Sequence, residues 1–135
     1  HLHCYRLREA IGAVVHTHSP AATTLAVLGR SLPAVHYLVA LNGTDHIPLA
    51  PYHRFGSAEL AQAAVDAMGE GWACILQNHG LLATGPELES AWDLAEQVEF
   101  CAELLLRAEA VGEPRILTEE QIAEVIEHLG SYTRQ

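Results

Sequence analysis

Residues 13–20 read AVVHTHSP, and this stretch decides the class of fold. Its first residues are apolar and partly β-branched, which is typical of a short strand buried in a sheet. Ser19 and Pro20 then offer the N-cap and the first position of a helix, which we expect to end at Gly29. A buried strand that passes directly into a helix indicates an α/β protein.

The rest of the chain continues this alternation of strands and helices. We predict short strands at 47–50, 72–78 and 81–84, the last two joined by a turn at His79 and Gly80. The end of one helix is predicted at 2–9, and a second helix at 58–68 follows the N-cap Ser57. A long helix is predicted from Pro86 to Gly112. A last helix is predicted from the capping box of Thr118 and Gln121 to Gly130. The order of the strands does not follow from this pattern.

The long helix should bury one stripe of side chains. The stripe predicted from helical spacing consists of Leu88, Ala91, Trp92, Ala95, Val98, Ala102 and Leu105. Glu99 falls within the same stripe. We favour a carboxylate that reaches solvent at the rim of the stripe, and the alternative is an acceptor that orients a metal-binding histidine.

Composition excludes several classes of function. Seven basic and 17 acidic residues give a formal net charge of −10, which disfavours nucleic acid and anionic membranes as partners. All the basic residues are arginine, so this chain has no Schiff-base, pyridoxal-phosphate or P-loop lysine. Cys4, Cys74 and Cys101 have no metal-binding spacing and are interpreted as reduced thiols of a cytoplasmic protein. No signal peptide or membrane span is recognised.

Three histidines stand where they could share a metal ion. His16 and His18 lie two residues apart, so on a strand both rings leave the same face, with Cα atoms about 6.6 Å apart. The alternative is that the pair caps the following helix. His79, at the end of another predicted buried strand, favours the metal interpretation. Three neutral imidazoles with an open position describe a catalytic zinc site, whereas a structural site more often uses cysteines.

Several segments together resemble the class II aldolase/adducin family. AVVHTHSP is similar to the family's metal-binding strand, and residues 77–85, which read QNHGLLATG, are similar to its second signature, together with the helix that follows. Residues 32–37 and 48–56 are similar to connecting segments of the L-fuculose-1-phosphate aldolase branch. The resemblance covers nearly the whole chain. It implies that residues 1–135 form a single domain, a three-layer α/β/α fold around a mixed, mostly antiparallel sheet.

The resemblance also implies a site and an activity. It implies that His16, His18 and His79 bind one Zn²⁺ per subunit, that Tyr37 donates a proton in a neighbouring subunit's site, and that Tyr132 is a second site tyrosine. The implied reaction cleaves a ketose 1-phosphate, similar to fuculose 1-phosphate, to dihydroxyacetone phosphate and an aldehyde through a metal-stabilised enediolate. The implied assembly is a homotetramer with sites between subunits. The absence of lysine agrees with a metal-dependent route.

In this family the catalytic glutamate and the phosphate-binding loops precede the position that His1 matches. We therefore expect the chain to be the C-terminal two-thirds of a longer protein and to be inactive alone, since Glu9 lies on the wrong side of that position. The remaining histidines, His36, His46, His53 and His128, are interpreted as surface or structural residues.

Two other kinds of function stay open. One is a sugar-phosphate 4-epimerase, dehydratase or decarboxylase of the same family, which would share the metal-binding histidines. The other is a non-catalytic, adducin-like interaction module, which would have no need of all three histidines.

Overall fold

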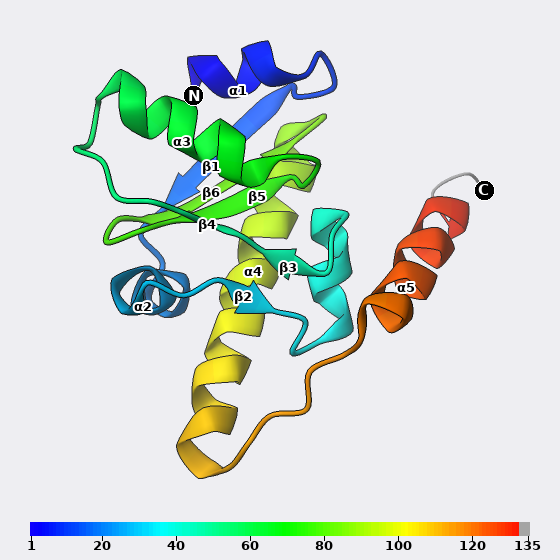
Figure 1. Cartoon of the computed structure of the whole chain (residues 1–135). Helices are drawn as coiled ribbons and strands as arrows, with labels where there is room; N and C mark the ends of the chain where they lie inside the picture. The colour runs from blue at the N-terminus through cyan, green and yellow to red at the C-terminus, as the bar shows by residue number, and fades with distance from the viewer. Residues whose placement is uncertain (133–135) are drawn as a thin grey trace.

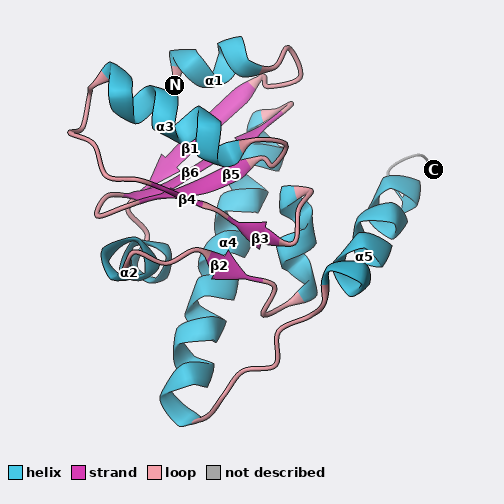
Figure 2. Cartoon of the chain, in the orientation of Figure 1, coloured by secondary structure: helices cyan, strands magenta, loops and turns pink. Residues whose placement is uncertain are grey.

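The structure is a computed structural model that describes the backbone of residues 1–132 and the side chains of residues 1–129. Its helices are α1 (Leu2–Leu7), α2 (Pro20–Leu28), the 3₁₀ helix η1 (Tyr37–Asn42), α3 (Ala58–Met68), α4 (Leu88–Val111) and α5 (Glu119–Tyr132). Its strands are β1 (Ala13–Thr17), β2 (Leu32–Pro33), β3 (His46–Ile47), β4 (Leu49–Ala50), β5 (Ala73–Leu76) and β6 (Gly80–Gly85). Figure 2 shows helices and strands along the chain.

The main sheet is mixed and mostly antiparallel. Its strand order is β1-β6-β5-β4, and β6 pairs antiparallel with both β1 and β5, whereas β4 runs parallel to β5. The segment predicted as one strand at 47–50 divides at Pro48. Ile47 pairs with Leu32 in the small β2–β3 sheet, while Leu49 pairs with Ile75 in the main sheet. Proline has no N–H to donate to a ladder, so the chain changes partner there.

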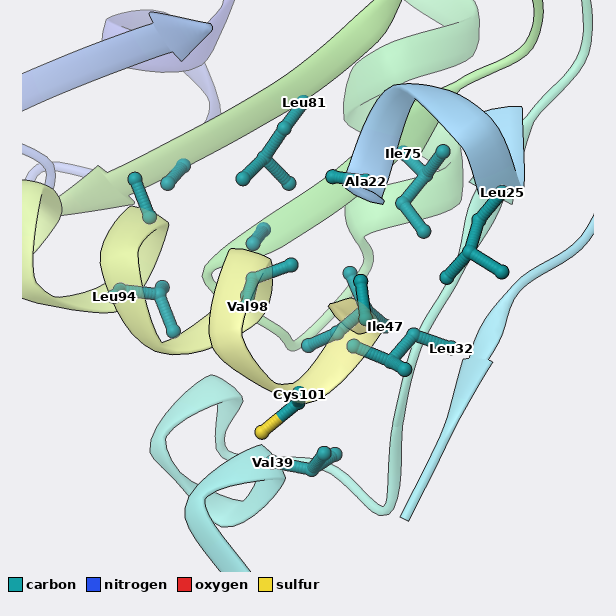
Figure 3. Packing of buried hydrophobic residues seen from close by; sticks show 14 of the residues in the cluster. Ala22, Leu25, Leu32, Val39, Ile47, Ile75, Leu81, Leu94, Val98 and Cys101 are labelled. Carbon is teal, nitrogen blue, oxygen red and sulfur yellow. The ribbon is translucent and has the colours of Figure 1, made fainter. Parts of the chain in front are cut away.

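Helices cover both faces of the main sheet, as Figure 1 shows: α1 and α3 lie on one side, and α2 and α4 on the other. Successive side chains of the strands therefore face opposite sides of the sheet. Ile75 and Leu81 face the larger core beneath α2 and α4, and Cys74 and Leu82 face the smaller core beneath α1 and α3. Figure 3 shows the larger core, where Val98 of α4 packs among strand and helix residues. This arrangement confirms the predicted three-layer α/β/α fold.

The buried stripe of α4 differs from the predicted one at its start. Leu88 is 65% exposed and Trp92 is 52% exposed, so their assignment to the stripe is wrong. The buried residues are Ala91, Leu94, Ala95, Val98, Cys101, Ala102 and Leu105. Helical periodicity alone could not decide between Trp92 and Leu94, because both continue an apolar stripe and only the position of the sheet selects one.

Most helix ends follow the sequence signals, but α4 begins at Leu88, behind the N-cap Glu87, and not at Pro86 as predicted. Oγ of Ser57 accepts the N–H of Leu60 at 3.1 Å, and Thr118 and Gln121 form the predicted reciprocal capping box. Gly112 ends α4 as predicted. Gly130 does not end α5, which continues to Tyr132, since one glycine costs a helix only about 1 kcal/mol. Ser19 occupies the N-cap of α2 but makes no side-chain cap bond.

Asn42 joins three elements in the interior. It is fully buried at the end of η1, and its Oδ1 accepts the N–H groups of Trp72 and Ala73 at 2.9 and 2.7 Å. Its Nδ2 donates to Oγ1 of Thr44 and to the carbonyl oxygen of His46, at 2.6 and 3.0 Å. All the side chain's polar atoms are therefore used to connect η1, β3 and the start of β5.

Candidate metal centre

β1 places His16 and fixes the orientation of its ring. His16 pairs with Leu82 across the β1–β6 ladder, and its Nδ1 lies 2.8 Å from the carbonyl oxygen of Leu81. A carbonyl oxygen only accepts hydrogen bonds, so Nδ1 must carry the proton and Nε2 must carry the lone pair. This is the tautomer in which Nε2 can bind a metal ion, with Nδ1 held by a backbone acceptor.

His18 lies one residue beyond β1 and faces His16. The Nε2 atoms of the two rings are 3.0 Å apart, and the ring centroids are 4.8 Å apart. Two nitrogens bound to one zinc ion at about 2.0–2.1 Å with tetrahedral angles would lie roughly 3.3 Å apart. The spacing that the strand's period of two predicted is therefore present, although His18 itself is exposed.

His79 comes from the turn between β5 and β6. Its ring centroid lies 4.8 Å from that of His16 and 5.1 Å from that of His18. The residue that takes the left-handed conformation in this turn is Asn78, with φ of 55°, whereas Gly80 does not take it. Asparagine tolerates this conformation better than most residues do, so the turn does not require glycine.

Gly80 is needed for a different reason, which is close packing. A Cβ atom at this position would lie 2.3 Å from the carbonyl oxygen of Thr17 and 2.9 Å from Cδ2 of His18. The missing side chain lets the end of β1 approach the turn that carries His79. Gly80 thus brings the two histidine-bearing segments together.

The three imidazoles form a group that could hold one metal ion. Their ligand nitrogens all lie within 4.8 Å of one another. Burial lowers the pKa of His16 and of His79 below the ordinary value of 6.5, and the nearby His18 adds to this effect. Both rings are therefore neutral at pH 7, the form in which imidazole binds a metal. A set of three imidazole nitrogen donors fits Zn²⁺ with one coordination position left for another ligand.

Two hollows border the histidines. One, of about 410 Å³, is lined by His16, His18, Tyr52, His53, Phe55, Asn78 and His79. The other, of about 580 Å³, lies between α1 and α3 and also reaches His16 and His79. His53 was interpreted as a surface or structural residue, but it is half-buried and lines the first hollow with all three candidate ligands. No spacing signal marks it, because the loop after β4 brings it there.

Glu99 makes neither of the two contacts considered for it: it is not solvated at the rim, and it does not accept a hydrogen bond from a histidine. Its Oε1 accepts the N–H of Ala21 at 2.7 Å, and its Oε2 accepts the N–H of Ala22 at 2.8 Å. The carboxylate therefore caps the first turn of α2, where Ser19 provides no side-chain cap. The preference for a solvated carboxylate at the rim of the stripe is wrong. No local pattern predicts this contact, because the partners are 77 and 78 residues apart.

Of the two tyrosines expected at the site, only Tyr37 has a described side chain, and it does not lie beside the histidines of its own chain. Tyr37 begins η1, is 52% exposed, and lines neither hollow. Its ring lies 4.5 Å from that of His36, which in turn lies 5.5 Å from that of Phe100. Tyr132 is the last residue of α5, and its side chain lies outside the described residues.

The described helices include none that is long and apolar enough to cross a membrane.

Comparison with known proteins agrees with this geometry. The chain is 43% identical over 135 residues to the 5-deoxy-D-ribulose 1-phosphate aldolase of Bacillus thuringiensis serovar kurstaki, covering 100% of this chain and 63% of that protein. It is 45% identical over 125 residues to the 5-methylthioribulose-1-phosphate/5-deoxyribulose-1-phosphate aldolase of Rhodospirillum rubrum, covering 93% and 57%. It is 41% identical over 133 residues to the L-fuculose phosphate aldolase of Escherichia coli, covering 98% and 62%.

Solved structures show the same fold. An L-fuculose 1-phosphate aldolase superposes with a TM-score of 0.91 at 37% identity, covering 93% of this chain and 59% of that chain. YgbL from Escherichia coli, described as an aldolase/epimerase/decarboxylase, superposes with a TM-score of 0.80 at 32% identity, covering 93% and 62%. The chain therefore spans less than two-thirds of the length of these relatives.

The family is established by a match that covers most of the chain. Residues 1–106 match the family described as Class II Aldolase and Adducin N-terminal domain. The match includes the strand that carries His16, the turn that carries His79, and α4 as far as Leu106. The chain belongs to the class II aldolase and adducin family.

Proposed function

We propose that the whole protein carrying residues 1–135 is a zinc-dependent aldolase that cleaves a ketose 1-phosphate to dihydroxyacetone phosphate and an aldehyde. The observation that carries this proposal is the convergence of His16, His18 and His79 at a hollow of about 410 Å³. A donor set with an open side suits an ion that must also bind substrate. The relatives named above are aldolases of 5-deoxyribulose 1-phosphate, 5-methylthioribulose 1-phosphate or fuculose phosphate.

The proposed role of the chain's residues is to hold the ion and orient its ligands. A bound zinc ion would supply Lewis-acid polarisation of the substrate carbonyl. The backbone carbonyl of Leu81 accepts the Nδ1 proton of His16, which would leave Nε2 available to bind the ion. No lysine is present in the sequence, so no Schiff base with these residues can replace the ion as the electron sink.

We also propose that Tyr37 donates a proton in the site of a neighbouring subunit, with Tyr132 as a second site tyrosine. Tyr37 is exposed and its ring rests against His36, so its hydroxyl can reach beyond its own subunit. This assignment needs a homo-oligomer, for which we propose a tetramer with sites between subunits. Light scattering on the whole protein tests it, and a monomer at micromolar concentration would contradict it.

The substrate proposed is a phosphorylated sugar of the ketose 1-phosphate class, similar to fuculose 1-phosphate. We propose that residues 1–135 are part of a single domain. The catalytic glutamate and the phosphate pocket are proposed to come from residues other than these. Residues 1–135 alone should then be inactive. Losing a general base costs about 10²–10⁴-fold, and losing phosphate binding removes the energy that positions the reacting carbons.

The decisive experiment assays the zinc-loaded whole protein on fuculose 1-phosphate, 5-deoxyribulose 1-phosphate and 5-methylthioribulose 1-phosphate. We expect dihydroxyacetone phosphate as a product, its loss on chelation, and its return when zinc is restored. His18→Ala should remove both bound zinc and activity. The similarity to YgbL motivates the alternative, an epimerase or decarboxylase. Epimerised sugar or released carbon dioxide without dihydroxyacetone phosphate would favour it.

A further inference from the structure

The first turn of α2 depends on a residue of another helix. Pro20 occupies the first helical position and has no N–H, and the N–H of Thr23 donates to the carbonyl oxygen of Ser19 at 2.9 Å. The two remaining N–H groups, of Ala21 and Ala22, donate to the carboxylate of Glu99 at 2.7 and 2.8 Å. Glu99 therefore satisfies every donor of this turn that the local chain leaves unpaired.

This turn begins two residues after a candidate metal ligand. His18 stands between the end of β1 at Thr17 and the N-cap Ser19, and its side chain is exposed. An exposed ring is not held by the packing of a core, so its position depends on its backbone. On one side that backbone is fixed by the pairing of Thr17 with Leu81. On the other side it is fixed by the first turn of α2.

Glu99 is itself rigidly placed. It lies in the middle of α4, beside the fully or nearly fully buried residues Val98 and Ala102 that face the core. Its two carboxylate oxygens bind two successive N–H groups, which fixes α2 in position and in rotation about its axis. The negative charge also lies at the positive end of the α2 dipole.

We propose that Glu99 is a positioning residue of the metal centre, which acts through the first turn of α2 to hold His18 in line with His16 and His79. This inference rests on the proposed metal-binding function. Glu99 does not belong to the group of ligand atoms, so it acts on the backbone and not on the ion. Residues that orient metal ligands typically change metal affinity about 10–100-fold when they are replaced.

The test compares zinc affinity in the unaltered protein and in four variants, measured by competition with a chromogenic chelator. Glu99→Gln keeps the size of the side chain but turns one acceptor into a donor that faces a backbone N–H. We expect its zinc dissociation constant to rise about 10–100-fold. Glu99→Asp keeps the charge at the helix end but is too short to bind both N–H groups, so its affinity should be intermediate. If Glu99→Gln fails to fold, Glu99→Asp carries the comparison.

Two control variants separate this effect from general loosening of α2 or loss of charge. Arg30→Ala removes the paired contacts of Arg30 with Glu109, at 2.9 and 2.6 Å, which connect the far end of α2 to α4. Glu96→Gln removes a carboxylate three residues before Glu99; both side chains line one hollow of about 420 Å³ between α4 and the N-cap of α2. Both should bind zinc as the unaltered protein does.

A purely structural role of Glu99 would not change the geometry of the bound ion. This geometry is therefore the second measurement. With Co²⁺ in place of zinc, the visible absorption of Glu99→Gln should lose intensity or shift, while near-UV circular dichroism of the chelated protein shows an intact fold. The proposal is overturned if Glu99→Gln is only less stable and binds zinc and Co²⁺ unchanged. Failure of the unaltered protein to bind zinc would instead overturn the metal centre itself, and this proposal with it.

Discussion

At the scale of single residues, Gly80 occupies a position of the candidate site that has no room for a side chain. Gly80→Ala would place a Cβ atom 2.3 Å from the carbonyl oxygen of Thr17, so β1 or the turn of His79 must move. We expect the free energy of unfolding to fall by about 1–3 kcal/mol, as for other overpacked sites. We also expect weaker zinc binding, because the movement separates His18 from His79. Urea unfolding with chelator and a zinc titration measure the two effects.

Gly112→Ala is the matched control for that change. A Cβ atom at Gly112 would meet no atom within 4 Å, and its backbone is extended, with φ of 179°. Its unfolding free energy should change by less than about 1 kcal/mol, with zinc affinity unchanged. Equal zinc affinity in Gly80→Ala and Gly112→Ala would show that the close approach does not position the ligands.

The histidines also predict how stability depends on pH. Burial lowers the pKa of His16 and His79 in the folded protein below 6.5, whereas in the unfolded chain these groups keep ordinary values. As the pH falls through about 6.5, the unfolded chain therefore binds protons before the folded protein does, and the folded state loses stability. We expect the chelated protein to have a lower unfolding free energy at pH 5.5 than at pH 7.5.

The control for the pH effect replaces both half-buried rings. The variant His16→Gln, His79→Gln should show a smaller difference between the two pH values in the same urea titrations. Because the other histidines remain, a residual slope is expected. An unchanged slope would assign the pH dependence to those other residues.

The candidate ligands could be predicted at this scale because the signal is local. His16 and His18 follow from the period of a strand, and His79 from its place after a buried strand. The roles of Gly80 and Glu99 could not be predicted in this way. Gly80 contacts Thr17, and Glu99 contacts Ala21 and Ala22, across more than 60 residues of sequence. Such contacts depend on how the strands and helices are arranged.

At the scale of elements, the side-chain hydrogen bonds of Asn42 join the small sheet to the main one. Asn42→Ala would leave the N–H of Ala73 without its acceptor and the carbonyl oxygen of His46 without one donor. A buried polar group that loses its partner costs about 1–3 kcal/mol. We expect a loss of that size or more in unfolding free energy, measured by urea titration followed by tryptophan fluorescence.

An exposed amide provides the comparison for Asn42. Gln62 of α3 donates to Asp66 at 2.8 Å on the surface. Gln62→Ala should therefore change the unfolding free energy by no more than about 0.5 kcal/mol. If the two variants were equally stable, the buried network of Asn42 would not stabilise the fold.

Elements were predictable where one local signal decides them. The capping pairs at Ser57 and at Thr118 with Gln121 fix where α3 and α5 begin, and both were located correctly. The buried face of α4 was only partly predictable, because Trp92 and Leu94 fit helical spacing equally well. The division at Pro48 has a local cause, but the change of strand partner depends on β2 and β5.

At the scale of the whole molecule, a bound metal should stabilise the fold through mass action. An ion that binds only the folded state at 100 times its dissociation constant adds about 2.7 kcal/mol to the unfolding free energy. We expect zinc to raise the midpoint of thermal unfolding and a chelator to reverse this. His18→Ala should abolish the shift. A zinc-induced shift that survives in His18→Ala would place the ion elsewhere.

The distance along the chain between the ligands has a consequence for the order of events in folding. His16 and the β6 residue Leu81 that holds its ring are 65 residues apart. Pairs of strands so far apart in sequence close late, because the loop between them must first lose its entropy. Zinc therefore cannot nucleate this fold as it does in a zinc finger, since its third ligand arrives only with β6. The ion should bind only after the main sheet has formed, and it should then stabilise the formed sheet. On heating, its release should coincide with the separation of β1 from β6.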